Sequence, residues 1–252
     1  MPETTVDWNL YDAVLFDLDG VVTPTAEVHM HAWAAMFNDF LSARGDDQPP
    51  YTDQDYFDHV DGKPRYDGVR SFLASRGITL PEGTPEDPPT AETVAGLGNR
   101  KNEAFNEILA KDGVEAYPGS VRLVEQLHGS GRKLAVVSSS RNAPAVLEAA
   151  GLTHYFDFVM HGGLAAELGL AGKPAPDTFT HAAEVLGATD DRAVVLEDAT
   201  SGVAAGRAGG FGLVIGVDRG AGADALRAAG ADVVVRDLAE LADQTEQTGE
   251  QA

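Results

Sequence analysis

Two aspartates, Asp17 and Asp19, stand directly after the apolar run Val14–Phe16 and just before Gly20. Such a run is typical of a strand buried on both faces, and a glycine lets the chain turn sharply behind it. Open α/β sheets bind their ligands at the carboxyl ends of such strands. Two neighbouring carboxylates repel each other, and Mg²⁺, which typically uses one or two carboxylates plus a substrate phosphate, would hold them together. The alternative is a turn capped by aspartates, and this pair alone leaves both interpretations equally open.

A second acidic strand end lies further along the chain, where the run Val194–Leu196 ends in Glu197 and Asp198. It repeats the design of the first, so a simple turn cap becomes a poorer explanation of both. Three glycines then recur in the helix expected near 201–208, which must therefore pack closely against its neighbours; they are Gly202, Gly206 and Gly209.

Two further segments of the chain carry residues that suit phosphate chemistry: small hydroxyl side chains in one and a lysine in the other. Ser138–Ser140 end the strand-like run 133–137, where hydroxyls and backbone N–H groups at a helix start suit phosphoryl oxygens. A helix N-cap is the alternative. Lys173 stands just before a helix begun by a proline, where its ammonium suits charge developing on a transferring phosphoryl group. An exposed lysine is the alternative there. Taken alone, the serine segment is better explained by a helix N-cap and the lysine by solvent exposure. Only the combination with the two acidic strand ends favours a role in phosphoryl transfer.

These residues need a sheet to position them, and the pattern after Tyr117 predicts one. Strand-like runs lie at 14–16, 133–137, 156–160, 193–196, 212–215 and 232–235, and helical patterns lie near 119–129, 143–150, 176–187 and 201–208. Alternation of this kind predicts an α/β fold, with a parallel sheet covered by helices on both faces.

Between the first two strands the chain has helical patterns only. A helix is expected over Thr25–Leu41, and residues 53–110 suggest further helical segments interrupted by a proline-rich break at Pro81–Pro89. We expect an inserted all-helical cap domain of residues 28–112, with residues 1–27 and 113–252 forming the core domain. The tail from about Glu240 is polar and acidic, and we expect it to be frayed.

The composition restricts the possible partners. Of the 252 residues 43% are hydrophobic, enough for a sizeable core. A formal net charge of −22 argues against nucleic acid and anionic membranes as partners. An anionic substrate would therefore need local cations.

The absence of cysteine excludes disulfides and thiolate metal sites. No apolar run reaches about 18 residues, which argues against a membrane span. The acidic stretch 1–7 lacks the basic region of a signal peptide, so we expect a cytoplasmic protein, and a monomer.

In chain order the four segments supply Asp-x-Asp, Ser, Lys-Pro and Glu-Asp, each at or just beyond a strand end. This order resembles the haloacid dehalogenase superfamily over residues 13–237. The resemblance implies a Rossmann-like sheet, Mg²⁺ as cofactor, and phosphoryl transfer through an aspartyl-phosphate. By that resemblance Asp17 is the nucleophile and Asp19 the general acid/base, while Ser138 binds the phosphoryl oxygens and Lys173 neutralises them.

The same resemblance implies the metal ligands: Asp17, the main-chain carbonyl of Asp19, and Asp198 with Glu197 beside it. These residue types suit the chemistry. A carboxylate nucleophile splits a very slow phosphoryl transfer into two steps. Mg²⁺ and a lysine offset the charge as two anions approach. The acid/base gives a proton to the leaving oxygen and later takes one from the next attacking group.

Within that superfamily the chain most resembles the β-phosphoglucomutase family. Four fragments carry the resemblance: Thr25–Trp33, Arg100–Asn102, Ser138–Asn142 and Gly172–Asp177. In the third fragment the family implies that Ser139, Ser140 and Asn142 bind the substrate together with Ser138.

The first two fragments supply three further residues with implied roles. Thr25 matches the family's hinge threonine, and His29 and Lys101 match the pair that couples cap closure to the acid/base. Without the resemblance, a histidine on a helix face and a solvated lysine would be the simpler interpretations.

The segment Gly62–Arg65 matches a Gly-x-x-Arg segment of the family's cap, which implies that Gly62 and Arg65 contribute to substrate binding. Arg65 would hold the phosphate that is not being transferred, because a guanidinium is always charged and binds phosphate bidentately. The chain departs from the family at Asp61, where the family has a lysine; Lys63 is a candidate replacement. The proline-rich segment Pro81–Pro89 is also longer than in the family. Both differences bear on sugar specificity.

The resemblance predicts an Mg²⁺-dependent mutase that interconverts β-D-glucose 1-phosphate and glucose 6-phosphate through phospho-Asp17 and β-glucose 1,6-bisphosphate. The first alternative is a sugar-phosphate phosphatase in which water replaces the sugar hydroxyl, and Asp61 is the feature that favours it. A dehalogenase would need no metal and would leave Glu197 and Asp198 unexplained. A non-enzymatic sugar-phosphate sensor is disfavoured because no catalytic position is missing.

Overall fold

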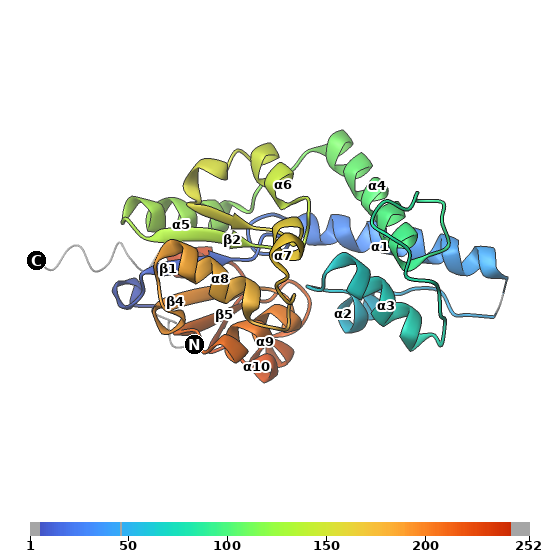
Figure 1. Ribbon diagram of the computed structural model, residues 1–252. Helices are drawn as coiled ribbons and strands as arrows, with labels where there is room; N and C mark the ends of the chain where they lie inside the picture. The colour runs from blue at the N-terminus through green and yellow to red at the C-terminus, as the bar shows by residue number, and fades with distance from the viewer. Residues whose placement is uncertain (1–5, 46, 243–252) are drawn as a thin grey trace, which may run out of the picture. The chain divides into compact units, whose positions relative to one another are not determined.

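The computed structural model describes residues 6–45 and 47–242, which form two compact units (Figure 1). The sheet unit falls within Met1–Pro24 and Glu115–Ala252, and the helical unit is Thr25–Val114. The expected domain bounds, after residues 27 and 112, lie close to these divisions. Most of the acidic N-terminal stretch and the tail beyond residue 242 lie outside the described residues.

Within the described residues of the sheet unit, six parallel strands form one sheet, in the order β3-β2-β1-β4-β5-β6. This is the strand order of a Rossmann-type fold, with its switch point between β1 and β4. The expected α/β class is therefore correct, and all six strands predicted from apolar runs are present. They are β1 (Ala13–Phe16), β2 (Lys133–Val137), β3 (Phe158–Met160), β4 (Ala193–Glu197), β5 (Leu213–Val217) and β6 (Val233–Val235).

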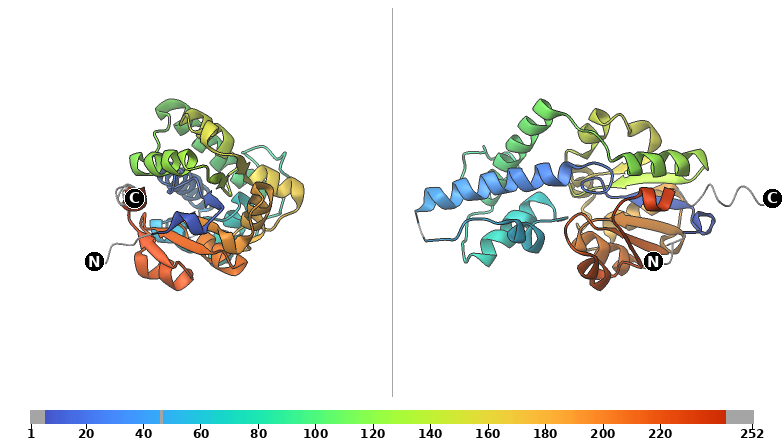
Figure 2. Two further views of the ribbon diagram at one scale, coloured as in Figure 1. Left: turned by 90° about the vertical axis from the view of Figure 1, so that its left-hand side faces the viewer. Right: turned by 180° about the vertical axis from the view of Figure 1, so that it is seen from behind.

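Helices cover both faces of this sheet (Figures 1 and 2). One face carries α5 (Pro118–Gly129) and α6 (Ala143–Ala149). The other carries α8 (Asp177–Leu186), α9 (Thr200–Gly209) and α10 (Ala223–Ala229). All residues of β1 are fully buried, as the continuous apolar run predicts for a strand covered on both sides.

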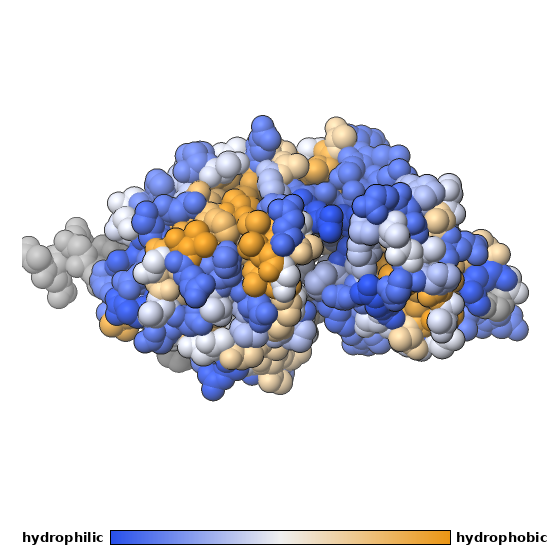
Figure 3. Space-filling model, viewed as in Figure 1, coloured by the Kyte–Doolittle hydropathy of each residue, from blue (hydrophilic) through white to orange (hydrophobic). Residues whose placement is uncertain are grey.

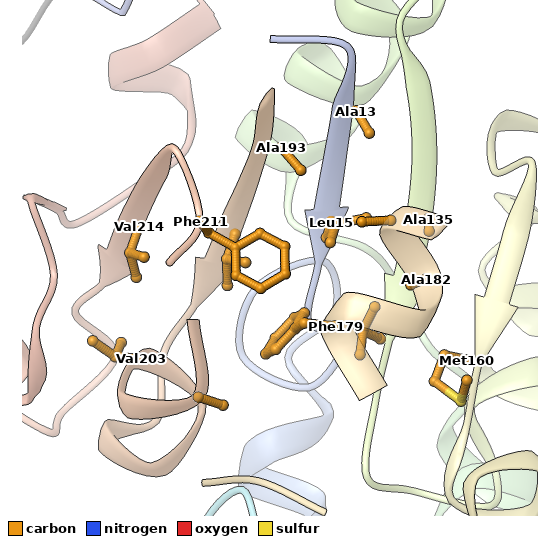
Figure 4. Close-up of a cluster of buried hydrophobic side chains, with 14 of the residues drawn as sticks. Ala13, Leu15, Ala135, Met160, Phe179, Ala182, Ala193, Val203, Phe211 and Val214 are labelled. Carbon is orange, nitrogen blue, oxygen red and sulfur yellow. The ribbon is translucent and has the colours of Figure 1, made fainter. Parts of the chain in front are cut away.

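The core beneath α8 combines small and large apolar residues from the strands and the helices (Figure 4). Ala13 of β1, Ala135 of β2 and Ala193 of β4 belong to this cluster together with Phe179 of α8. The ring of Phe179 meets Phe211 edge-on, with the ring centroids 6.0 Å apart. This packing brings the start of α8, and the lysine loop before it, down onto the middle of the sheet.

The structure adds helices that the sequence patterns did not predict. They are α7 (Gly162–Leu168), α10 and α11 (Ala239–Ala242), together with the short 3₁₀ helices Trp8–Leu10, Thr153–Tyr155 and Asp190–Arg192. The expectation of a frayed tail from about residue 240 is wrong for residues 240–242, because Leu241 and Ala242 are buried and α11 packs on α5.

The helical unit contains no strand within residues 47–114, in agreement with the prediction. Its core is aromatic: Phe37 lies 4.1 Å from Phe72 and 5.1 Å from Tyr51, measured between ring centroids. Thr93 caps the last helix by accepting a hydrogen bond from the Gly96 N–H. The four helices are α1 (Thr25–Arg44), α2 (Asp53–His59), α3 (Arg65–Ser75) and α4 (Val94–Asp112).

The face drawn in Figure 3 is mainly hydrophilic, which agrees with the net charge of −22. This face shows an apolar area over the sheet unit. On α8, Val185 is half exposed. Among the described helices, none combines the length and apolarity required to cross a bilayer.

Candidate active site

Three strand ends meet at the switch point of the sheet. Asp17 follows β1, Ser138 follows β2, and Glu197 ends β4 with Asp198 directly after it. The ladders continue past the strands: the Asp17 N–H donates to the Leu196 carbonyl (2.9 Å), and the Ser138 N–H donates to the Met160 carbonyl (3.0 Å). The predicted core residues therefore share one edge of the sheet, where α/β folds bind ligands.

Lys173 is the centre of a buried cluster at this edge. Its ammonium donates to Asp17 Oδ1 (2.5 Å), Glu197 Oε1 (2.6 Å) and the Val137 carbonyl (2.9 Å). It also lies 4.9 Å from the centre of the Phe179 ring, a favourable cation–π position. Lys173 is 3% exposed, so its interpretation as an exposed lysine is wrong.

The charges of this cluster do not balance. Asp17, Glu197 and Asp198 are three buried carboxylates, whereas Lys173 is the one buried cation among the described residues of the sheet unit. Burial raises the pKa of Asp17 well above its usual range; Lys173 opposes this rise, and Glu197 and Asp19 add to it. Burial alone would lower the pKa of Lys173, but the carboxylates of Asp17 and Glu197 outweigh it and raise that pKa. Lys173 is thus an ammonium at neutral pH, and a further cation would offset the remaining negative charge.

The site fits Mg²⁺ by its donors. No group of three or more His, Asp or Glu side chains forms a metal site within the described residues. Mg²⁺ does not need one, since it binds through one or two carboxylates, substrate phosphate and water. Asp198 is packed against Gly20, because a Cβ on that glycine would stand 1.8 Å from Asp198 Oδ2. Only glycine therefore leaves Asp198 space beside the turn that carries Asp19, and Gly20 also has a φ of +87°.

Glu197, predicted as a metal ligand, uses its carboxylate oxygens for hydrogen bonds within the protein. Its Oε1 accepts from Lys173, and its Oε2 accepts from the Ala199 N–H (2.9 Å). It is fully buried, and a Cβ on Gly202 of α9 would stand 1.8 Å from its Oε1. Both oxygens are therefore used within the protein, and the geometry favours a role in holding Lys173. The close packing expected of the α9 glycines is confirmed here.

Gly202→Ala tests how tightly Glu197 is held. Alanine normally stabilises a helix by about 1 kcal/mol relative to glycine. Here the added methyl would displace Glu197 from Lys173, so we expect destabilisation of about 1–3 kcal/mol and loss of most activity. Denaturant unfolding measures the first effect. Gly129→Ala in α5 is the matched control, because its Cβ would meet nothing within 4 Å; equal behaviour of both variants would contradict this description.

The serine loop lies beside the acid/base candidate. Ser138 Oγ donates to Asp19 Oδ2 (3.3 Å) and accepts from the Ser140 N–H (3.0 Å). Ser140 Oγ accepts from the Asn142 N–H (3.1 Å), just before α6 begins. The loop thus joins Ser138, Ser140 and Asn142 in one chain of hydrogen bonds, and Ser139 lies between them in sequence.

Arg219 is a contributor that the sequence patterns missed. From the loop after β5 its Nε donates to the Gly20 carbonyl (3.0 Å), and its guanidinium stacks 3.9 Å from the centre of the Tyr117 ring. Tyr117 in turn donates its N–H to the Val22 carbonyl (3.0 Å). Arg219 therefore braces the turn behind Asp19. No local pattern marks it, since its partners are distant in sequence.

The helical unit brings together the predicted pair His29 and Lys101. Lys101 Nζ and His29 Nδ1 form a hydrogen bond. The His29 ring stacks on Phe105 with centroids 4.1 Å apart, and Lys101 lies 5.1 Å from the Trp33 ring centre. Lys101 is 4% exposed, so the interpretation as a solvated lysine is wrong. Thr25 is buried and opens α1.

Arg65 lies at the first position of α3, directly after the turn at Gly62, whose φ is +70°. Its guanidinium donates to Asn102 Oδ1 (2.8 Å) and Asn99 Oδ1 (3.3 Å), both on α4. Lys63, the candidate replacement for the family's lysine, donates instead to the His59 carbonyl (2.9 Å) and to Ser71 Oγ (3.0 Å). Its ammonium is therefore engaged within the helical unit.

Comparisons with known proteins identify the family of the chain. The family model of haloacid dehalogenase-like hydrolases matches residues 11–210. The β-phosphoglucomutase of Mycobacterium bovis (strain ATCC BAA-935 / AF2122/97) is 52% identical over 237 residues, covering 91% of this chain and 90% of that protein. The β-phosphoglucomutase of Bacillus subtilis (strain 168) is 34% identical over 230 residues, covering 91% of each. The crystal structure of β-phosphoglucomutase from Clostridium difficile has a TM-score of 0.74 at 23% identity, covering 94% of this chain and 96% of that one.

The matches and the strand-end site define an enzyme that acts by phosphoryl transfer, of the isomerase type. The chain belongs to the haloacid dehalogenase superfamily and, within it, to the β-phosphoglucomutase-like family.

Proposed function

We propose that this chain is an Mg²⁺-dependent mutase that interconverts β-D-glucose 1-phosphate and glucose 6-phosphate. The observation that carries the proposal is the buried contact between Asp17 and Lys173 at the switch point. A carboxylate held there beside a fixed ammonium suits a nucleophile that attacks a phosphate monoester. The relatives named β-phosphoglucomutase support the choice of reaction.

In the proposed reaction a carboxylate oxygen of Asp17 carries the phosphoryl group between two sugar oxygens. Phospho-Asp17 transfers its group to the 6-hydroxyl of β-glucose 1-phosphate, and the P–O bond to Asp17 breaks as the bond to the sugar forms. Asp19 takes the hydroxyl proton. The resulting β-glucose 1,6-bisphosphate turns over and returns its 1-phosphoryl group to Asp17, while Asp19 gives the proton to the leaving oxygen.

The remaining core residues bind and balance charge in this proposal. Ser138, with Ser139, Ser140 and Asn142, binds phosphoryl oxygens, and Ser138 holds Asp19 by its hydrogen bond. Asp17, Asp198 and the Asp19 carbonyl would hold Mg²⁺, which supplies charge neutralisation at the phosphoryl oxygens when bound. Glu197 holds Lys173 in place rather than binding the metal.

In this proposal the residues of the helical unit bind the substrate and couple this unit to the proton transfers. Arg65, following Gly62, binds the phosphate that is not being transferred, and His29 with Lys101 couples the helical unit to the proton transfers, with Thr25 at its hinge. We also propose that the enzyme is cytoplasmic and active as a monomer.

A sugar-phosphate phosphatase using the same Asp17 remains the second candidate, because Asp61 stands where the family has lysine. ³¹P NMR of the purified protein with Mg²⁺, β-glucose 1-phosphate and a trace of bisphosphate separates the two. The mutase converts the 1-phosphate signal into that of glucose 6-phosphate. Release of inorganic phosphate without glucose 6-phosphate would overturn the proposal in favour of the phosphatase.

Arg65→Ala is the variant that discriminates the two reactions. Charge-assisted hydrogen bonds contribute about 1.5–3 kcal/mol each, so loss of a bidentate phosphate contact is expected to lower kcat/KM for β-glucose 1-phosphate by about 10²-fold or more. Steady-state assays with and without bisphosphate measure this. A phosphatase acting on small monophosphates would show little change.

A further inference from the structure

Two asparagine side chains of α4 hold the guanidinium of Arg65. Asn99 Oδ1 and Asn102 Oδ1 accept from its two terminal nitrogens at 3.3 and 2.8 Å. Helix α4 can approach this closely because of Gly98, whose added Cβ would stand 3.1 Å from Arg65 Cδ and 2.8 Å from the Tyr66 ring. Amide oxygens orient the arginine without neutralising its charge, which keeps it available to a phosphate.

Both the oxygen and the nitrogen of the Asn99 side-chain amide form hydrogen bonds, and these define one orientation of the amide. Its Oδ1 accepts from Arg65 and from the Tyr66 hydroxyl (3.1 Å), and its Nδ2 donates to the carbonyls of Pro85 (3.0 Å) and Asp87 (2.9 Å). A flipped amide would turn NH₂ toward the guanidinium and oxygen toward two carbonyls, so only this orientation satisfies all four partners. Asn99 therefore links Arg65 to the proline-rich segment Pro81–Pro89.

That segment is itself fixed on the start of α4. The Asp87 carboxylate accepts from the hydroxyls of Thr93 (2.6 Å) and Thr84 (3.1 Å). The Val94 N–H donates to the Pro81 carbonyl (2.9 Å), and Arg100 Nε donates to the Pro89 carbonyl (2.8 Å). The carbonyls that hold Asn99 thus belong to a segment anchored at both ends and in its middle.

We propose that Asn99 is a positioning residue that fixes the Arg65 guanidinium to the Pro81–Pro89 segment, and that this segment thereby sets the affinity for the bisphosphorylated sugar. The inference rests on the proposed role of Arg65 in binding the phosphate that is not transferred. It assigns a function to the proline-rich segment Pro81–Pro89. A pre-oriented guanidinium loses less freedom when it binds phosphate, so the segment acts on binding more than on the chemical step.

The test is a double-mutant cycle on Asn99 and Arg65. Asn99→Ala is expected to raise the KM for β-glucose 1,6-bisphosphate about tenfold while kcat changes less than threefold. Arg65→Ala is expected to raise this KM more, and adding Asn99→Ala to it is expected to change the KM little further. Asn99→Asp keeps an oxygen that accepts from Arg65, but it places a carboxylate against the carbonyls of Pro85 and Asp87. The KM of this variant is therefore expected to rise at least as much as that of Asn99→Ala.

Asn38→Ala is the matched control. Like Asn99, Asn38 holds backbone of the helical unit through its side-chain amide. Its oxygen accepts from the Tyr51 N–H (2.8 Å), not from Arg65. We expect it to lower thermal stability and leave the KM unchanged. The inference is overturned if Asn99→Ala leaves the KM unchanged while Arg65→Ala raises it, or if the two effects add in full. If Arg65→Ala itself has no effect, the proposed role of Arg65 fails, and the inference falls with it.

Discussion

Asp17→Asn is expected to abolish turnover, with kcat falling by about 10⁴-fold or more, because a carboxamide cannot form the proposed aspartyl-phosphate. Coupled assay of glucose 6-phosphate formation measures the loss. Mass spectrometry of the wild-type protein after brief exposure to bisphosphate is expected to show one added phosphoryl group on the peptide containing residue 17, and that group is expected to be absent from the variant.

The same variant should keep its fold. The carboxamide introduced by Asp17→Asn retains an oxygen for the Lys173 ammonium, and the change removes one of three buried carboxylates that face one buried cation. Asp12→Asn is the matched control: the same change just before β1, at an exposed residue that pairs with Arg192. It is expected to leave activity intact, since exposed ion pairs contribute little. Turnover by Asp17→Asn within tenfold of wild type would point to another nucleophile.

Lys173→Met is expected to affect both stability and activity. Removing the ammonium leaves Asp17 and Glu197 buried without their cation, and breaking a buried ion pair typically costs about 3–5 kcal/mol. Loss of a fixed positive charge beside the transferring group is expected to lower kcat by about 10²–10³-fold. Urea unfolding and the glucose 6-phosphate assay measure the two effects separately.

A double variant, Lys173→Met with Glu197→Gln, separates the causes. Glutamine keeps an oxygen for the Ala199 N–H and removes one of the unpaired carboxylates, so part of the lost stability is expected to return while activity stays low. If Lys173→Met unfolds at the same urea concentration as wild type, the ammonium is not what holds the buried carboxylates, and the description of this cluster fails.

The sequence determined the sheet and the residues at its edge. Strands buried on both faces leave continuous apolar runs, so all six could be predicted, and an acidic or hydroxyl residue that interrupts such a run marks a strand end. Asp17, Ser138 and Glu197 were found in this way. The short helices α7 and α10 were missed because α7 begins with two glycines, which disfavour a helix, and α10 has one large apolar residue, Leu226, so that no periodic pattern stands out.

Only the tertiary structure decided which role each side chain of the site has. Glu197 and Asp198 are equivalent carboxylates in the sequence, but the close approach of α9 at Gly202 turns Glu197 to Lys173 while Gly20 gives Asp198 its place. Likewise Asn99 and Arg219 belong to no local motif. Their partners lie 34 and 199 residues away, and such pairings follow from the packing of whole helices and loops, which local sequence does not encode.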